Sequence, residues 1–329
     1  NDALIESNSF GEINAIISSS ESIGPITANA EGIFSKLTEL NTTQSRGDLL
    51  TLKVTDEINL EKVNTLDEIT SSTINVSSLN DTFENIEKVN ALFPDNSLLD
   101  GVSIASAEIT VSDTVDNSKA TLLNSFTSNK VIIKDINDSY ENILAIESQK
   151  FTQDSNDGLD ISNSTITVND SISLENVNSL NLFTNAKISI ELFADTLNNT
   201  QLLRAISNDL VDSSDTSLTI IDQVSFEDII NSSPFNVEAF PSLKLSLITD
   251  SYEDIVKLNN SLLEGETPIS MQTSTIQVLD SIDFTKLQTI RSYTDQSIIV
   301  DEILGSSEEL TEISGFSDVI ISNSDITIT

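Results

Sequence analysis

Cysteine and histidine are both absent from this chain of 329 residues. Without cysteine, the chain can form no disulfide, no thiolate metal site and no cysteine nucleophile. Without histidine, it lacks the usual general base near neutral pH and the usual zinc ligand. Small eukaryotic secreted domains are typically rich in disulfides. A large cysteine-free chain rich in acidic residues, Ser, Thr and Asn is therefore more typical of a bacterial exported protein.

Basic residues are scarce, since 15 Lys and Arg face 53 Asp and Glu and give a formal net charge of −38. No basic patch can neutralise phosphates, which excludes nucleic acid and anionic membrane surfaces as partners. Long apolar runs are absent too, so we expect no direct insertion into a membrane. A saline medium or divalent cations would relieve the self-repulsion of such a chain, although simple solubility is an equally good explanation of the charge.

Aromatic residues and glycine are also few. Aromatics make up 5% of the chain, there is no Trp, and only nine Gly occur. Burial must then depend on Ile, Leu and Val, with Phe as an occasional filler. Such a core suits thin repeated layers better than one large globule.

What the chain does contain is a short strand pattern, Ile/Val-x-Val/Ile-x-Asp, that recurs at regular intervals. Taking the second apolar residue as an anchor, the intervals by subtraction are 22, 35, 22, 35, 22, 30, 27, 31, 22 and 28. In pairs they give 57, 57, 52, 58 and 50, which indicates a two-strand repeat of about 50–58 residues and a stacked array. The anchors are Val54, Val76, Val111, Ile133, Val168, Ile190, Ile220, Leu247, Val278, Val300 and Ile328.

Each repeat combines two kinds of periodicity. Ile109 and Val111 alternate with Thr110 and Ser112, as in a strand with one buried and one solvated face. Between the strands the apolar spacing changes to that of amphipathic helices. We expect helices over residues 81–93, 139–147, 174–183 and 251–262. The sequence therefore predicts an α/β repeat fold, an elongated and mainly parallel β/α solenoid.

The chain divides into two parts on this interpretation. Residues 1–50 read as a degenerate N-terminal repeat or cap with a helix near 28–40, and residues 51–329 as the repeat array. The longer intervals contain turn residues followed by a small apolar patch, so we expect a second short element in each. Residues 325–329 read as the start of another strand, so we expect further repeats beyond Thr329.

Eight aspartates follow the strand copies directly and are the candidate site residues. A structural interpretation makes them helix caps or Asx-turns, because a carboxylate there accepts bonds from free amides. The alternative interpretation stacks them along one edge, where Ca²⁺ would relieve their repulsion. Calcium is therefore the only cofactor that we consider, and its ligands would be Asp56, Asp113, Asp135, Asp170, Asp222, Asp250, Asp280 and Asp301.

Carboxylate catalysis is the only enzymatic route left by this composition. A glycoside hydrolase needs two acids across a cleft. Among 53 acidic residues any pair is uninformative, and these acids recur at repeated positions, as structural residues do. We therefore expect no catalytic residues, and a carboxylate-dependent glycoside hydrolase is the weakest alternative.

The repeat resembles one found in very large bacterial exported and cell-surface proteins, often adhesin-like and dependent on type I secretion. The stretches that carry the likeness are Ile109–Thr114 with Leu122 and Leu123, then 131–135 and 245–255. The chain departs from these proteins in using Asn, Ser and Ile where many have Ala, and in lacking their glycine-rich calcium block. The resemblance implies an extracellular or cell-surface scaffold without catalytic residues.

Together these observations predict a structural protein, a repeat unit of a surface layer, sheath, filament or giant adhesin. Its partners would be other copies of itself, through lateral or head-to-tail contacts. The alternative is a module that binds a cell-surface glycan or a host surface. An aromatic-lined concave face would favour that alternative, and three Tyr with no Trp argue weakly against it.

Overall fold

The computed structural model describes residues 5–6, 26–28, 52–67, 73–92, 101–152, 157–206, 210–231, 242–264 and 269–328. These residues form two compact units. The first unit comprises residues 1–166 and 183–186, and the second comprises 167–182 and 187–329. Most of the predicted N-terminal repeat, including the helix near 28–40, lies outside the described residues.

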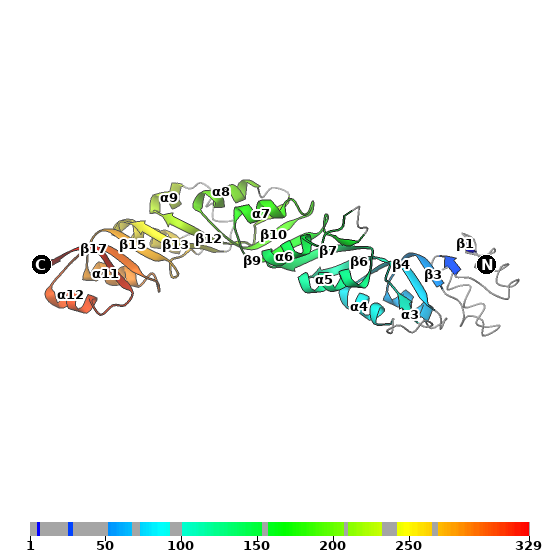
Figure 1. Cartoon of the computed structure of the whole chain (residues 1–329). Helices are drawn as coiled ribbons and strands as arrows, with labels where there is room; N and C mark the ends of the chain where they lie inside the picture. Colours follow the sequence, from blue (N-terminus) through cyan, green and yellow to red (C-terminus); the bar gives the residue numbers. More distant parts are fainter. Residues whose placement is uncertain are drawn as a thin grey trace. The chain divides into compact units, whose positions relative to one another are not determined.

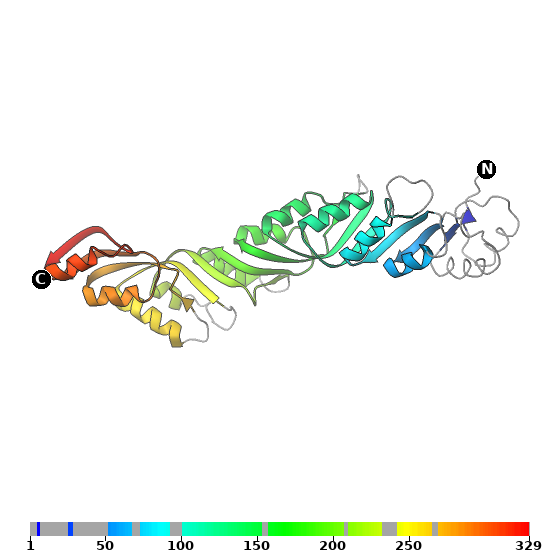
Figure 2. The same cartoon turned by 90° about the horizontal axis from the view of Figure 1, so that it is seen from below.

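In the first unit, strands alternate with short helices (Figures 1 and 2). Its elements are β1 (Ile5–Glu6), β2 (Ile26–Ala28), β3 (Leu52–Ile58), α3 (Leu60–Asp67), β4 (Ile74–Asp81), α4 (Phe83–Ala91), β5 (Val102–Ser103), β6 (Glu108–Val115), α5 (Asn117–Phe126), β7 (Lys130–Asp138), α6 (Tyr140–Glu147) and β8 (Gly158–Asp160).

The second unit repeats the same alternation. Its elements are β9 (Thr165–Ile172, whose first two residues belong to the first unit), α7 (Leu174–Leu180), β10 (Ile188–Asp195), α8 (Leu197–Ile206), β11 (Val211–Asp212), β12 (Ser217–Val224), α9 (Phe226–Asn231), β13 (Ser242–Asp250), α10 (Tyr252–Glu264), β14 (Ile269–Ser270), β15 (Thr275–Asp283), α11 (Phe284–Arg291), β16 (Ile298–Gly305), α12 (Ser307–Ile313) and β17 (Val319–Ile328).

Neighbouring strands within each unit pair in parallel, so both units have the α/β architecture of a parallel sheet with intervening helices. The short strands explain the longer intervals of the repeat. The first half of β4 pairs with β5, as in Ile74↔Val102, and its second half pairs with β6, as in Leu79↔Ile109. In the second unit, β13 divides its length between β14 and β15 in the same way. The repeat therefore contains two long strands and one short one.

One strand in each of several pairs carries a β-bulge. In β6 the register against β7 shifts between Val111 and Thr114, and the same shift occurs in β3, β12 and β15. A bulge inserts one extra residue and turns the following side chains. Asp113 lies within the bulge of β6, so the bulge decides where this carboxylate points.

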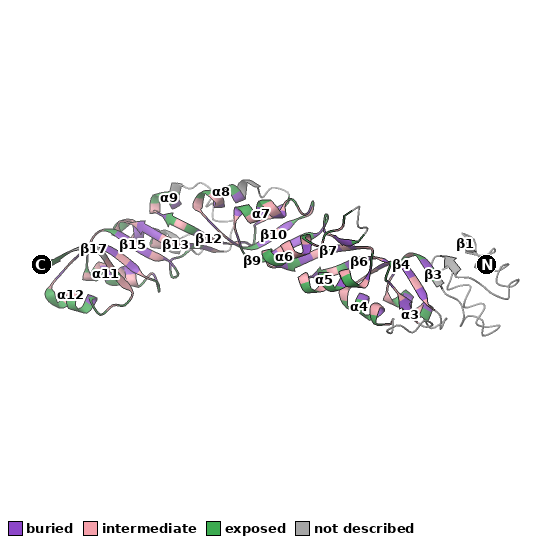
Figure 3. Cartoon of the chain, in the orientation of Figure 1, coloured by how far each residue is buried: buried purple, intermediate pink, exposed green. Residues whose placement is uncertain are grey.

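The core lies between the helices and one face of the strands (Figure 3). Ile109 and Val111 of β6 are fully buried, as are Ala120 and Leu123 of α5, a helix that contacts both β6 and β7. Ser112, on the opposite face of β6, is exposed. Full burial of an Ile, Val or Leu side chain contributes about 1.5–3 kcal/mol. Burial of Ile109 and Val111 confirms the predicted buried face, but Thr110, which the sequence places on the solvated face, is also buried.

We call each long strand together with the helix that follows it a layer. Buried hydroxyls join adjacent layers at the turns before the long strands. Ser164 Oγ donates to the Ile133 carbonyl at 2.5 Å, and Thr184 Oγ1 donates to the Ser164 carbonyl at 2.7 Å. Ser274 and Thr294 form the same arrangement in the second unit. These bonds satisfy carbonyls that burial would otherwise leave without a partner.

The predicted elements are present, but two anchors are wrong. The four expected helices correspond to α4, α6, α7 and α10, and all eleven anchors lie in strands. Leu247 is the wrong anchor for β13, because Ile220 pairs with Leu245, which is fully buried, while Leu247 is partly exposed. The error arises because Leu243, Leu245 and Leu247 alternate in the sequence, whereas the buried residues of β13 change phase after Leu245 to Ile248.

Ile328 is the wrong anchor for β17, because Val300 pairs with Ile321, while Ile328 pairs with Gly305 and is exposed. Residues 325–328 are therefore the end of β17 and not the start of another strand.

Candidate functional site

Four strands end in an aspartate that reaches the helix of the neighbouring layer. These aspartates are spaced by 57, 57 and 55 residues, by subtraction. Each uses Oδ2 to accept the backbone N–H of the first residue of the helix before its own strand. The pairs are Asp81 with Leu60 at 2.9 Å, Asp138 with Asn117 at 2.7 Å, Asp195 with Leu174 at 2.9 Å and Asp250 with Phe226 at 2.8 Å.

The second oxygen of the same carboxylate organises the helix that follows. Asp138 Oδ1 accepts the Ser139 N–H at 2.8 Å and the Asn142 side-chain amide at 2.7 Å. Ser139 itself is the N-cap of α6 and accepts the Asn142 N–H. Asp81 and Asp195 make the same pair of contacts with their own neighbours. One carboxylate thus stabilises the N-termini of two successive helices, where negative charge is favourable.

Aspartates in three β-bulges each bind the N-terminus of one helix, namely α4, α8 or α10. Each accepts the N–H of the first helical residue of the preceding layer. The pairs are Asp113 with Phe83 at 2.7 Å, Asp222 with Leu197 at 2.9 Å and Asp280 with Tyr252 at 2.6 Å. Asp56 and Asp170 stand at the corresponding places in β3 and β9 and also have interaction partners.

The two remaining candidates lie elsewhere in the strands. Asp135 of β7 accepts hydroxyl hydrogen bonds from Thr114 and, at 2.5 Å, from Thr165. Asp301 of β16 is partly exposed. Of the eight aspartates that the sequence singles out, four accept helix N–H groups: Asp113, Asp222, Asp250 and Asp280. Within the described ranges, no three Asp or Glu side chains gather in a group that could hold a metal ion. Calcium binding stays a prediction.

The electrostatics of Asp81 show the balance at such a site. Burial raises the pKa of this carboxyl. Hydrogen bonds from the Leu60 amide, the Asn85 side chain and the Thr82 amide lower the pKa, and their combined effect is larger than that of burial. The net pKa lies below the usual value for Asp, so the site prefers the charged form.

Asp81, Asp138 and Asp195 are not among the eight candidates from the sequence, because they stand several residues beyond the anchors. A signal for them exists in the motif Asp-Ser/Thr-x-x-Asn/Asp, which recurs at 81–85, 138–142, 195–199 and 250–254. The next position in this series is Gly305, where β16 offers no carboxylate.

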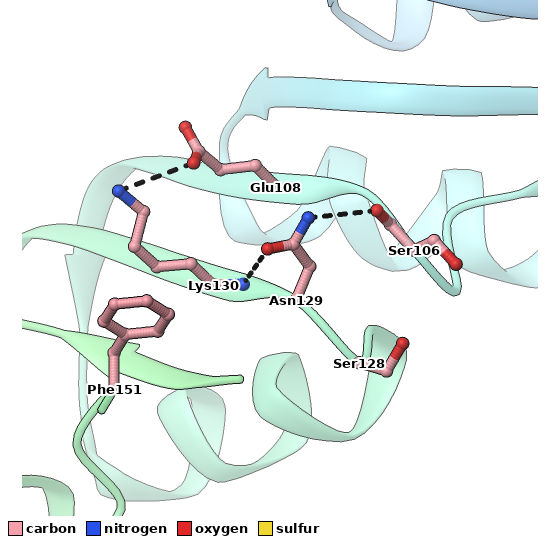
Figure 4. A pocket seen from close by; sticks show the side chains of 6 residues that line it. All are labelled: Ser106, Glu108, Ser128, Asn129, Lys130 and Phe151. Atoms are coloured by element: carbon pink, nitrogen blue, oxygen red, sulfur yellow. Dashed lines mark hydrogen bonds and ion pairs between the residues drawn. The ribbon is translucent and has the colours of Figure 1, made fainter. Parts of the chain in front are cut away.

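A pocket of about 430 Å³ opens in the first unit beside the starts of β6 and β7. Its lining residues, shown in Figure 4, are Ser106, Glu108, Ser128, Asn129, Lys130 and Phe151. The Lys130 ammonium lies 3.4 Å from Glu108 Oε2, 3.7 Å from Asp160 Oδ2 and 5.9 Å from the centre of the Phe151 ring.

Asn129 holds the floor of this pocket in place. Its Nδ2 donates to the Ser106 carbonyl at 3.1 Å, and its Oδ1 accepts the Lys130 N–H at 2.8 Å. Phe151 is fixed by its own backbone, because its N–H donates to the Leu159 carbonyl at 2.8 Å. Next to it, Gly158 has φ +115°, and a Cβ there would meet the 149–151 backbone at 2.8–2.9 Å. Only glycine lets this segment approach so closely.

Comparisons with protein-family models, with curated proteins and with solved structures found no match for this chain. In the part of the chain that the structure describes, no helix combines the length and the apolar character needed to cross a membrane.

Proposed function

We propose that this chain is an extracellular structural protein, a repeat segment of a surface layer, sheath, filament or giant adhesin, built as an elongated β/α solenoid. The observation that carries the proposal is the bond between layers. At seven described positions, a strand carboxylate accepts the first N–H of the helix in the preceding layer. Such a bond recurs with the sequence repeat and makes each layer depend on the next, as in repeat proteins.

The hydrogen bonds that the buried and partly buried aspartates accept support a mechanical role for these residues rather than a catalytic one. A catalytic acid must be free to exchange a proton with substrate and is tuned towards neutral pH. Asp81 is held in its charged form by amide donors, and Asp138 and Asp195 have the same three kinds of donor. We therefore propose that the chain is not an enzyme.

The composition supports an exterior location and contacts between copies. A formal charge of −38 opposes compaction and association at low ionic strength. A saline exterior screens these charges within about 10 Å. We propose that copies then associate laterally or head to tail, and that Ca²⁺ bridges between acidic surfaces contribute to the association.

Negative-stain electron microscopy of the purified chain tests this proposal. The chain is imaged at physiological salt with CaCl₂ at about 10 mM, well above the weak affinities of extracellular calcium modules, and again with EDTA. Sheets or fibres that form only with calcium support a cation-linked assembly. Assembly in both conditions keeps the structural role and rejects the calcium bridge. Compact, unassembled particles in both conditions reject the proposed scaffold.

A further inference from the structure

The pocket at Phe151 departs from the repeat that surrounds it. Backbone hydrogen bonds fix which residues are equivalent: the Ser128 N–H donates to the Ala105 carbonyl as the Asn185 N–H donates to the Ser162 carbonyl. By this alignment Lys130 corresponds to Lys187, but Glu108 corresponds to Thr165 and Asn129 to Ala186. The Asp295 N–H donates to the Gln272 carbonyl in a third equivalent layer, where the corresponding residues are Thr275, Gln296 and Ser297. Glu108 is therefore the residue that both other layers replace with Thr.

The ion pair alone does not explain these changes. Lys187 pairs with Asp212 at 2.5 Å, just as Lys130 lies near Asp160. The equivalent layer thus keeps its lysine and aspartate without a glutamate or an asparagine. Glu108 and Asn129 add a carboxylate and a rigid floor to an ion pair that is already complete, and Phe151 adds an apolar wall.

The polar groups retain unused hydrogen-bonding capacity. The Lys130 side chain is 24% exposed and has three N–H donors, while Glu108 is 41% exposed and has acceptor sites facing solvent. Ser128 Oγ donates to the Ala105 carbonyl, which leaves its lone pairs available as acceptors. Figure 4 shows the Lys130 side chain between the Phe151 ring and Glu108, so donors and acceptors line the pocket together with one aromatic ring.

This mixture restricts the chemistry of a ligand. Two carboxylates surround one ammonium, so an anion such as phosphate would be repelled. A ligand cation would compete with the Lys130 ammonium, which already faces the Phe151 ring. A neutral polyol is not repelled by the carboxylates or by the ammonium, and its hydroxyls both donate and accept.

We propose that this pocket binds one neutral saccharide residue, with the apolar face of the sugar ring against Phe151 and its hydroxyls on Lys130 and Glu108. The pocket volume of about 430 Å³ lies within the range of small-ligand sites. This site goes beyond the proposed scaffold role and does not depend on it, because it needs only the fold of one layer.

Two-dimensional NMR of the ¹⁵N-labelled chain tests the site with the methyl glycosides of glucose, galactose and N-acetylglucosamine, each titrated to about 50 mM to reach millimolar affinities. At least one glycoside is expected to shift the amides of Asn129, Lys130 and Phe151 in a saturable manner. If none of the three shifts these amides, the saccharide site is wrong.

Three variants separate this site from binding elsewhere. Phe151→Ala is expected to weaken binding about tenfold, because it removes the apolar wall. Glu108→Thr copies the residue of the equivalent layer, so it leaves the fold intact while removing the carboxylate, and should also weaken binding. Lys187→Ala is the matched control outside the pocket and should leave the affinity unchanged. Equal affinity in Phe151→Ala and the unmodified chain would overturn the proposal.

Discussion

Replacing Asp195 with alanine removes a carboxylate on β10 that holds two helices at once. Its Oδ2 accepts the Leu174 N–H of α7 at 2.9 Å, and its Oδ1 accepts the Thr196 N–H at 2.8 Å and the Asn199 side chain at 2.9 Å. Asp195 is only 7% exposed, so water cannot fully replace these bonds. The loss should therefore reach α7, which lies 21 residues earlier in the sequence.

The size of the effect follows from the donors left behind. The bond to Leu174 is buried, and an unsatisfied buried N–H costs about 1–3 kcal/mol. The Thr196 and Asn199 groups are only partly buried, and losing a charged N-cap acceptor there costs about 1 kcal/mol. We expect Asp195→Ala to lower the free energy of unfolding by about 3 kcal/mol. Glu191→Ala is the matched control, because it removes an exposed negative charge from the same strand and should change stability by less than about 0.5 kcal/mol.

Urea denaturation measures the two free energies, and hydrogen exchange locates the effect. In Asp195→Ala, exchange should accelerate at the start of α7 as well as at the start of α8, and Glu191→Ala should change neither. Acceleration confined to α8 would refute the bond between layers and leave only a local cap. A destabilisation no larger than that of the control would refute the energetic argument.

The other predictions concern the buried hydroxyls, the core and the ion pairs. Ser164→Ala should destabilise the chain by about 1 kcal/mol in urea, because the Ile133 carbonyl loses its donor; a larger loss is not expected, since the equivalent residue in another layer is already Ala107. Phe193→Ala should cost about 3–5 kcal/mol in the same assay, because its fully buried ring leaves a cavity, and a loss below 1 kcal/mol would contradict its place in the core. Hydrogen bonds from Lys187 and Ser214 lower the pKa of Asp212 to about 2, below the usual value for an aspartate. The stabilisation from this depressed pKa is therefore present above about pH 4 and is lost as the pH falls towards 2. Lys187→Met should raise the pKa of Asp212 in an NMR titration, and an unchanged value would contradict the ion pair.

The strand–helix alternation was predictable from the sequence because both periodicities are local. Ile109 and Val111 alternate with polar residues, and the helix residues Ile86 and Val89 are buried at the expected spacing. The N-caps Thr82 and Ser139 were also predictable, since a cap bonds within its own turn.

Which helix each aspartate side chain binds was not predictable from a local pattern. A helix cap was the structural interpretation of Asp113, but the helix it serves begins at Phe83, 30 residues earlier. Parallel pairing and the bulge create this contact, and neither is visible in a local pattern. The pocket was missed for a related reason, because Glu108 of β6, Lys130 of β7 and Phe151, in the segment after α6, are far apart in the sequence.

Small-angle X-ray scattering of the intact chain tests the central claim most directly, namely that the repeats stack into an elongated solenoid. A compact domain of 329 residues has a radius of gyration of about 20 Å. The proposed solenoid predicts a clearly larger radius and a pair-distance distribution with the long tail of a rod, unchanged by calcium if the chain is monomeric. A radius near 20 Å with a symmetric distribution would contradict it.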